Sequence, residues 1–246
     1  MYSMPETVKP RIAISEPCSY DRDYSSRALP RYVKAVESCG GDAVVIPLDS
    51  TPEQVARLAT GCDAILLSGS IADVDPQKFG AAKHPQTARA DALRDAVDEL
   101  LLQDAYNLRK PVFGICYGLQ SLNVWRTGTL VQHIESATEH SPEDKDKLAH
   151  EVVIEPETLL ARNVGTKTVS VNSSHHQSAQ VAGDGLRVVA KCPADGVIEA
   201  LEGTSPDHYV LAVQWHPERS FAQDKPSQNL FQSFVDAARL WSASRE

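Results

Sequence analysis

Short apolar segments alternate with amphipathic segments over the first half of the chain. The apolar segments have the length and the branched side chains of buried strands, and they lie at 11–15, 43–47, 64–67 and 111–115. Between them, apolar residues recur every three or four positions, as on a helix with one buried face. This alternation predicts an α/β protein with a parallel sheet and helices on both faces.

Two of the expected helices have clear boundary signals. Around Tyr32–Cys39 the helical spacing ends at Gly40-Gly41, a common helix stop. A second helix is expected to begin at Thr51, because Thr51 can cap it, Pro52 suits its first turn and Gln54 completes a capping box. A third, longer amphipathic pattern covers 93–105.

The pattern changes after about residue 150. Short apolar runs follow one another with little helical pattern between them, at 152–154, 168–171, 186–190, 196–201 and 209–215. We expect these runs to extend the same sheet with antiparallel strands, and a last helix to cover 230–240. The stretch 139–147 is polar and charged, and we expect an exposed loop. No repeat or linker divides the chain, so we expect one domain over 1–246.

Composition narrows the classes of function. The chain is 42% hydrophobic and 23% charged, with a formal net charge of -9, which disfavours a nucleic-acid partner. No apolar run reaches the roughly 18 residues of a membrane helix, and the first ten residues lack the apolar core of a signal peptide, so we expect a cytoplasmic protein with no membrane partner. The five cysteines are scattered and odd in number, which disfavours a disulfide framework or a zinc ribbon.

Cys116 differs from the other cysteines in its local pattern. Gly114-Ile-Cys-Tyr-Gly118 follows an apolar strand and opens an expected helix, which is the arrangement of a nucleophile elbow with cysteine in place of serine. The helix N-terminus would favour the thiolate and lower the pKa of Cys116. The alternative is a structural cysteine in a tight strand-to-helix turn.

His216 and Glu218 lie two residues apart after the apolar run 209–213. In an extended segment such residues project to the same side, so the carboxylate can orient the imidazole. A His-x-Glu pair also begins the zinc deaminase signature, but no P-C-x-x-C follows here. Cys116, His216 and Glu218 together repeat the logic of a serine triad.

Five segments resemble the class I glutamine amidotransferases, in particular their γ-glutamyl-γ-aminobutyrate hydrolase (peptidase C26) branch. They are Leu67–Gly80, Gly114–Gln120, Thr127–Leu130, Val171–Gln177 and Gln214–Glu218, and they occur in the family's order between about residues 11 and 240. The resemblance implies a flavodoxin-like three-layer fold and the Cys116–His216–Glu218 triad. It also implies an oxyanion hole from the backbone N–H groups of Ser70 and Tyr117, with Gly69, Gln120, Ser173 and Ser174 at the substrate.

The sequence departs from that pattern at two positions. The branch commonly has arginine where Tyr117 stands, and tyrosine there is more similar to the amidotransferase domain of GMP synthetase. Many relatives have Gly-Gly where Gly69-Ser70 stands. Both changes concern the leaving group and leave the triad intact.

The expected activity is hydrolysis of a small γ-glutamyl compound through a cysteine thioester, without metal or organic cofactor. His175 and His176 are not expected to bind one metal ion, because adjacent residues on a strand point opposite ways. Two alternatives stay open: a glutaminase subunit that delivers ammonia to a separate synthetase, and a non-catalytic binding module. A homodimer also stays open.

Overall fold

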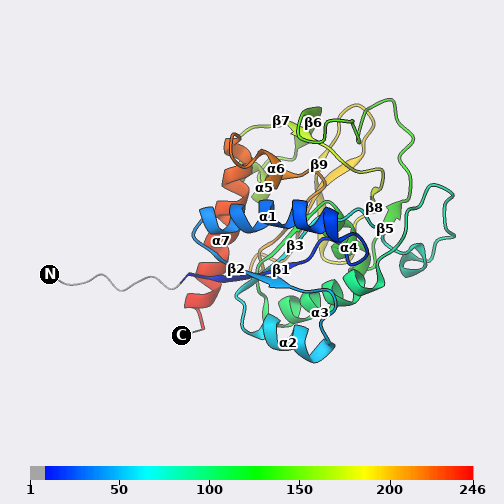
Figure 1. Ribbon diagram of the computed structural model, residues 1–246. Helices are drawn as coiled ribbons and strands as arrows, with labels where there is room; N and C mark the ends of the chain where they lie inside the picture. The colour runs from blue at the N-terminus through cyan, green and yellow to red at the C-terminus, as the bar shows by residue number, and fades with distance from the viewer. Residues whose placement is uncertain (1–8, 246) are drawn as a thin grey trace.

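A nine-stranded mixed sheet forms the centre of the computed structural model, which describes residues 9–245 (Figure 1). The strands are ordered β2-β1-β3-β4-β11-β10-β9-β6-β7. Their bounds are β1 Arg11–Ser15, β2 Asp42–Ile46, β3 Ala64–Leu67, β4 Val112–Ile115, β6 Leu148–Ile154, β7 Thr168–Asn172, β9 Leu186–Lys191, β10 Ile198–Gly203 and β11 Val210–Val213. Two further strands, β5 (Thr129–Val131) and β8 (Ser178–Val181), pair with each other outside this sheet.

The sheet is parallel on one side and antiparallel on the other. The pairs from β2 to β11 are parallel, and those from β11 to β7 are antiparallel. The expectation that the run 209–215 belongs to the antiparallel extension is wrong, because β11 pairs in parallel with β4. All four residues of β11 are buried, as in a central strand covered on both faces.

Helices cover both faces of the sheet. The core between the sheet and α1, α5 and α7 contains Ile12 and Ile14 of β1, while Ala13 faces the second core, under α2, α3 and α4. This alternation along one strand is the reason that both faces need a helical layer. The helices are α1 Arg22–Ser38, α2 Pro52–Thr60, η1 Pro76–Phe79, α3 Ala92–Leu108, α4 Tyr117–Trp125, α5 Leu159–Val164, α6 Pro217–Ser220 and α7 Lys225–Ala243. The predicted flavodoxin-like α/β fold is therefore confirmed.

The local sequence signals succeed where they describe a helix end. Thr51 Oγ1 accepts from the Gln54 N–H at 3.3 Å, and Gln54 Oε1 accepts from the Thr51 N–H at 2.7 Å, so the predicted capping box forms. The loop 139–147 is exposed at most positions, as expected, but the side chain of His140 is buried. Strands β5 and β8 and the short α5 were not predicted.

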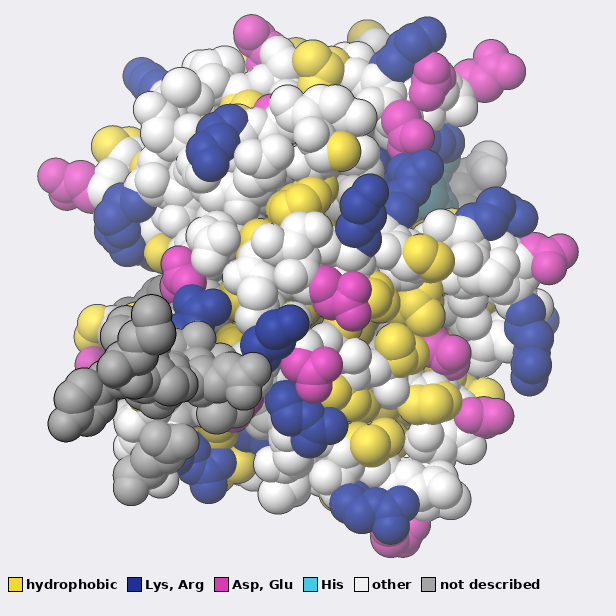
Figure 2. All heavy atoms as spheres, turned by 60° about the vertical axis from the view of Figure 1, so that its left-hand side comes forward, with side chains coloured by type: hydrophobic (Ala, Val, Ile, Leu, Met, Phe, Trp, Pro, Cys, Tyr) yellow, Lys and Arg dark blue, Asp and Glu magenta, His cyan; other side chains and the backbone are white. Residues whose placement is uncertain are grey.

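The surface and the chain ends add little to the function. On the face that Figure 2 shows, Lys and Arg side chains are intermixed with Asp and Glu side chains. In residues 9–245, no helix is both long and apolar enough to cross a membrane. All five cysteines are buried and unpaired. The expectation about a signal peptide concerns residues that lie, for the most part, outside the described ones.

Candidate active site

The turn between β4 and α4 holds Cys116 in an uncommon backbone conformation. Cys116 has φ 53° and ψ -102°, a positive φ that costs energy for any residue with a Cβ. Its N–H donates to Val213 O of β11 at 2.8 Å, which anchors the turn to the centre of the sheet. Strain of this kind is typical of a nucleophile held clear of a sheet.

Two glycines make this turn possible by close approach. A Cβ on Gly118 would lie 2.2 Å from Leu67 O, and a Cβ on Gly114 would lie 2.9 Å from the Gly118 carbonyl. Both positions therefore require glycine for space rather than for conformational freedom. The approach brings the first turn of α4 against the end of β3, where the Ser68–Ser70 loop begins.

His216 and Glu218 form a buried pair at the end of β11. Nδ1 of His216 lies 2.8 Å from Oε1 of Glu218, and both side chains are 2% exposed. His216 Nε2 has no hydrogen-bond partner among residues 9–245. Asn172 holds the main chain of His216, because Asn172 Nδ2 donates to His216 O at 2.8 Å and His216 N–H donates to Asn172 Oδ1 at 2.9 Å.

Burial sets the protonation of the resting site. It raises the pKa of the Cys116 thiol to about 12, even though Arg219 and the Tyr117 backbone N–H lower it. Burial also lowers the pKa of His216, with the charge of Arg219 acting in the same direction. For Glu218 burial alone would raise the pKa, but the neighbouring His216 and Arg219 outweigh it and lower the pKa.

The expectation of a lowered pKa for Cys116 is therefore wrong for the ligand-free site. The N-terminus of α4 acts as expected, but the thiol is removed from water and the cost of burying a charge is larger. The resting pair is a neutral thiol and a neutral imidazole. Such an imidazole can accept the thiol proton when a substrate arrives.

A pocket of about 180 Å³ brings most of the predicted residues together. Cys116 and His216 both line it, and so do Ser70, Gln120 and Ser174. Glu218 lies behind His216. The pocket is small compared with the roughly 300–1,000 Å³ of sites for drug-sized ligands, so it suits a small molecule.

The predicted oxyanion loop is held from two sides. A Cβ on Gly69 would lie 2.9 Å from both His216 Cε1 and Tyr32 Oη, and Gly69 N–H donates to Tyr32 Oη at 3.0 Å. Ser70 follows at the pocket wall, with its hydroxyl accepting from Ala72 N–H at 3.0 Å. Tyr117 opens α4, so its N–H belongs to the helix end that has no intrahelical acceptor.

The predicted substrate-binding residues differ in their positions. Gln120 Nε2 donates to Gln177 O and Gln214 Oε1, each at 3.2 Å, at the floor of the pocket. Ser174 lines the pocket, whereas Ser173 is fully buried and donates to His140 O at 2.7 Å. The Ser173 hydroxyl therefore supports the loop and does not face a substrate.

Sequence reasoning missed two arginines at the site. Arg219 follows the His-Pro-Glu segment directly and is the only Lys or Arg among the described residues that line the Cys116 pocket. Its charge lowers the pKa of both Cys116 and His216. A basic residue beside the triad was the available signal.

Arg94 is the second missed residue, and it is fully buried. Its guanidinium pairs with Asp98 at 2.9 Å and donates to Ser68 O at 2.5 Å, and it lies 4.8 Å from the centroid of the Tyr117 ring. It therefore fixes the loop before Ser70 against α3. Nothing in its helical spacing distinguished it from a surface arginine.

Comparisons with known proteins agree with this geometry. The model of the peptidase C26 family matches residues 12–218. The chain is 31% identical over 228 residues to the γ-glutamyl-γ-aminobutyrate hydrolase PuuD of Escherichia coli, covering 88% of each chain. It is 32% identical over 210 residues to the protein NtpR of Enterococcus hirae, covering 83% of this chain and 86% of that one.

A solved structure shows the same fold at low sequence identity. It is a Thermoplasma acidophilum protein described as a GMP synthase subunit, with a TM-score of 0.70, 14% identity, and coverage of 97% of this chain and 98% of that one. This likeness concerns the fold alone. Taken with the extent of the family match and with the relatives that cover most of their own length, it leads to one conclusion: the chain belongs to the peptidase C26 family of glutamine amidotransferase-like hydrolases.

Proposed function

We propose that this protein hydrolyses the γ-glutamyl amide bond of a small γ-glutamyl compound, releasing glutamate and an amine. One observation carries the proposal. Cys116, strained at the strand-to-helix turn, shares a small pocket with His216, whose Nε2 has no other partner in residues 9–245 and whose Nδ1 is held by Glu218. The described elements between Arg11 and Ala243 would act as a single domain.

In the first half-reaction the Cys116 sulfur attacks the γ-carbonyl carbon of the substrate. The thiol proton passes to His216 Nε2, and Glu218 stabilises the imidazolium through Nδ1. The oxyanion accepts from the backbone N–H groups of Ser70 and Tyr117, each worth roughly 3 kcal/mol in the transition state. The C–N bond then breaks, the amine leaves with the proton from Nε2, and a γ-glutamyl thioester remains.

In the second half-reaction water replaces the amine. His216 Nε2 takes a proton from the water as its oxygen attacks the thioester carbon. The C–S bond breaks, glutamate leaves, and the proton returns to the sulfur. No metal or organic cofactor takes part in either step.

Charges in the pocket support an amino-acid substrate. Arg219 offers a cation for a carboxylate, and Asp73, which lines the same pocket, offers an anion for an ammonium group. Asp73 is already paired with His176 Nε2 at 3.0 Å, which holds it in place. A γ-glutamyl group carries both charges at its α-carbon.

A neighbouring pocket supports an amine larger than ammonia. It has a volume of about 310 Å³ and shares Tyr24 and Arg219 with the Cys116 pocket. Arg27 and Lys145 also line it, together with acidic residues of the 139–147 loop. An amine that itself carries a carboxylate, as in γ-glutamyl-γ-aminobutyrate, could extend in that direction, and this favours hydrolysis over ammonia delivery.

A substrate panel tests the proposal. Glutamate release is measured from glutamine, γ-glutamyl-γ-aminobutyrate, other γ-glutamyl amines and γ-glutamyl peptides, with Cys116→Ala as the inactive control. We expect turnover of a γ-glutamyl amine without any partner and none in the variant. Activity only with glutamine and an added synthetase would instead support ammonia delivery to a synthetase, and activity retained by Cys116→Ala would refute the mechanism.

A further inference from the structure

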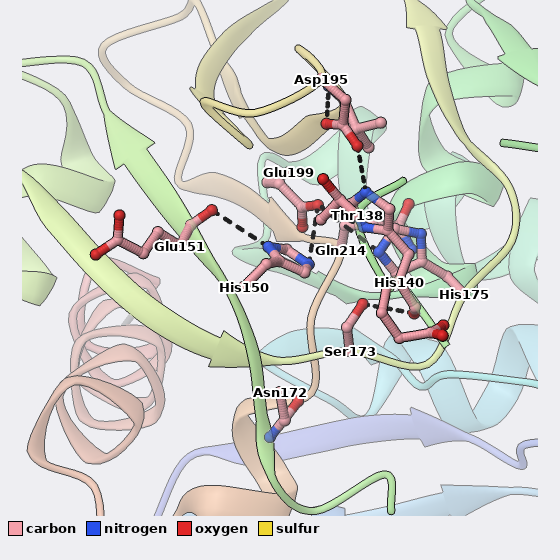
Figure 3. A network of polar contacts seen from close by, with 12 residues as sticks. Thr138, His140, His150, Glu151, Asn172, Ser173, His175, Asp195, Glu199 and Gln214 are labelled. Carbon is pink, nitrogen blue, oxygen red and sulfur yellow. Dashed lines mark hydrogen bonds and ion pairs between the residues drawn. The ribbon is translucent and has the colours of Figure 1, made fainter. Parts of the chain in front are cut away.

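Three histidines and one glutamate converge in the interior beside the active site (Figure 3). They are His140 of the 139–147 loop, His150 of β6, His175 of the segment after β7 and Glu199 of β10. Their side chains are between 0% and 4% exposed. Four separate segments therefore place ligand-type side chains at one buried point.

The inner atoms of this cluster face one another without hydrogen bonds. Oε1 of Glu199 lies 3.5 Å from His140 Nδ1, 3.5 Å from His150 Nε2 and 3.7 Å from His175 Nε2. These separations are too long for good hydrogen bonds. None of these three nitrogens, and neither oxygen of Glu199, has a partner within residues 9–245.

The outer ring nitrogens, by contrast, all have oxygen partners. His140 Nε2 lies 2.8 Å from Asp195 Oδ2, His150 Nδ1 lies 3.2 Å from Glu151 O, and His175 Nδ1 lies 2.9 Å from Gln177 O (Figure 3). Because an oxygen can only accept here, each outer nitrogen carries the proton, and each inner nitrogen presents a lone pair. Metal-binding histidines are oriented in this way.

The spacing of the inner atoms fits a tetrahedral ion. With Zn–N bonds of about 2.0–2.1 Å, the ligand atoms of a tetrahedral zinc site lie about 3.3 Å apart. The observed 3.5–3.7 Å separations from Glu199 are close to this value, and all four ligand atoms lie within 4.8 Å of one another. A buried carboxylate without a partner is costly, and a cation at the centre would remove that cost.

We propose that His140, His150, His175 and Glu199 bind one divalent metal ion of the zinc type, in a structural site separate from the Cys116 chemistry. Four protein ligands close the coordination shell, which is typical of structural rather than catalytic zinc. The histidines act as neutral ligands, and the carboxylate supplies one negative charge.

Such an ion would stabilise one wall of the substrate pocket. His140 O accepts from Ser173 Oγ at 2.7 Å and from His175 N–H at 3.0 Å, so the 139–147 loop and the segment after β7 already meet there. Glu199 O accepts from Gln214 N–H at 2.8 Å, two residues before His216. The ion would join these contacts across four segments.

The neighbouring histidine confirms that sequence adjacency is not the basis of the site. His176 Nε2 lies 3.0 Å from Asp73, and His176 Nδ1 lies 3.2 Å from His133 Nδ1, away from the cluster. His175 and His176 thus do not share an ion, as expected. The other ligands of His175 come from residues that are distant in sequence.

A second grouping, His140 with Cys192 and Asp195, competes for the same histidine. Asp195 already accepts from Ser136 Oγ at 2.6 Å and from the Val197 N–H at 3.1 Å, besides its contact with His140. Its oxygens are therefore engaged, unlike those of Glu199. This favours Asp195 as a partner of a ligand and not as a ligand.

Metal analysis of the full chain tests the proposal. Protein purified without a histidine tag from zinc-supplemented cells is dialysed and its metal content measured. We expect about one zinc per chain, and less than about a tenth of that in Glu199→Gln and His150→Gln. The matched controls His133→Gln and Cys192→Ser should keep the ion.

A second measurement on the wild-type chain holds even if those variants fail to fold. X-ray absorption at the zinc edge should show about three imidazoles and one oxygen at about 2.0–2.1 Å, and chelation should lower the melting temperature by about 5 °C or more. A zinc-free wild-type protein whose melting temperature does not respond to added zinc would overturn the proposal. So would loss of zinc in Cys192→Ser together with its retention in Glu199→Gln.

Discussion

Asn172 forms two hydrogen bonds with the main chain of His216, one from its Nδ2 to the His216 carbonyl and one to its Oδ1 from the His216 N–H, at 2.8 and 2.9 Å. The two residues are 44 positions apart, and this contact joins β7 to the end of β11. A side chain that satisfies both groups of one peptide acts as a rigid support for the imidazole.

Asn172→Ala should therefore reduce kcat more than it raises KM. We expect kcat to fall about 10- to 100-fold, because a small displacement of a catalytic base is costly, and unfolding to become about 1–3 kcal/mol easier. Steady-state kinetics and urea unfolding measure both effects. Asn172→Asp, which keeps the acceptor and loses the donor, should fall between the two, and an unchanged kcat in Asn172→Ala would contradict the supporting role.

The pKa of Cys116 predicts how the free enzyme reacts with alkylating reagents. Because burial raises the pKa of the thiol to about 12, the thiolate fraction is small at neutral pH and grows about tenfold per pH unit. The inactivation rate by iodoacetamide should rise in that proportion between about pH 7 and 9. A rate that is constant over this range would indicate a preformed thiolate–imidazolium pair, and peptide mapping with Cys116→Ser as control identifies the modified residue.

Arg219 should influence both the protonation of the site and substrate binding. Its charge lowers the pKa of His216, and the reaction needs His216 neutral, so the acid limb of kcat/KM should lie below the ordinary histidine pKa of about 6.5. Arg219→Gln removes that charge, so the acid limb should move to higher pH and KM should rise about tenfold or more. Arg219→Lys keeps the charge and should keep the acid limb; a profile identical in all three proteins would exclude the electrostatic role.

Gly118 should tolerate no side chain. A Cβ there would lie 2.2 Å from Leu67 O, a backbone atom that cannot move without disturbing β3. Gly118→Ala should destabilise the protein by about 3 kcal/mol or more. Gly196→Ala is the matched control: Gly196 has φ 76° and nothing within 4 Å of its added Cβ, so only conformational strain of about 1 kcal/mol is expected. Equal effects in urea unfolding would show that the contact with Leu67 is not decisive.

The buried Arg94–Asp98 pair should be important for stability. Arg94→Leu leaves the fully buried Asp98 without its cation, which should cost about 3–5 kcal/mol. The double variant Arg94→Leu/Asp98→Leu should recover part of this loss, because no uncompensated charge remains, while the carbonyl of Ser68 still lacks its donor. Urea unfolding of the three proteins gives the coupling, and strictly additive losses would argue against the pair.

The sequence determined the elements whose signals are local. The capping box at Thr51, the apolar strands and the turn around Cys116 depend on neighbouring residues, so their identity could be interpreted directly. His216 and Glu218 were paired correctly in position because they are two residues apart. The direction of β11 was not accessible in this way, since a fully apolar strand fits a central parallel position and an antiparallel one equally well.

Only the tertiary structure decided which distant side chains share a buried site. Asn172 under His216, Arg94 behind the Ser68 loop, and the convergence of His140, His150, His175 and Glu199 join residues tens of positions apart. The protonation of Cys116 belongs here too, because the local helix N-terminus and the global burial act in opposite directions and burial is stronger. Hydrogen-bond partners and loss of water depend on packing, and no local pattern in a chain records them.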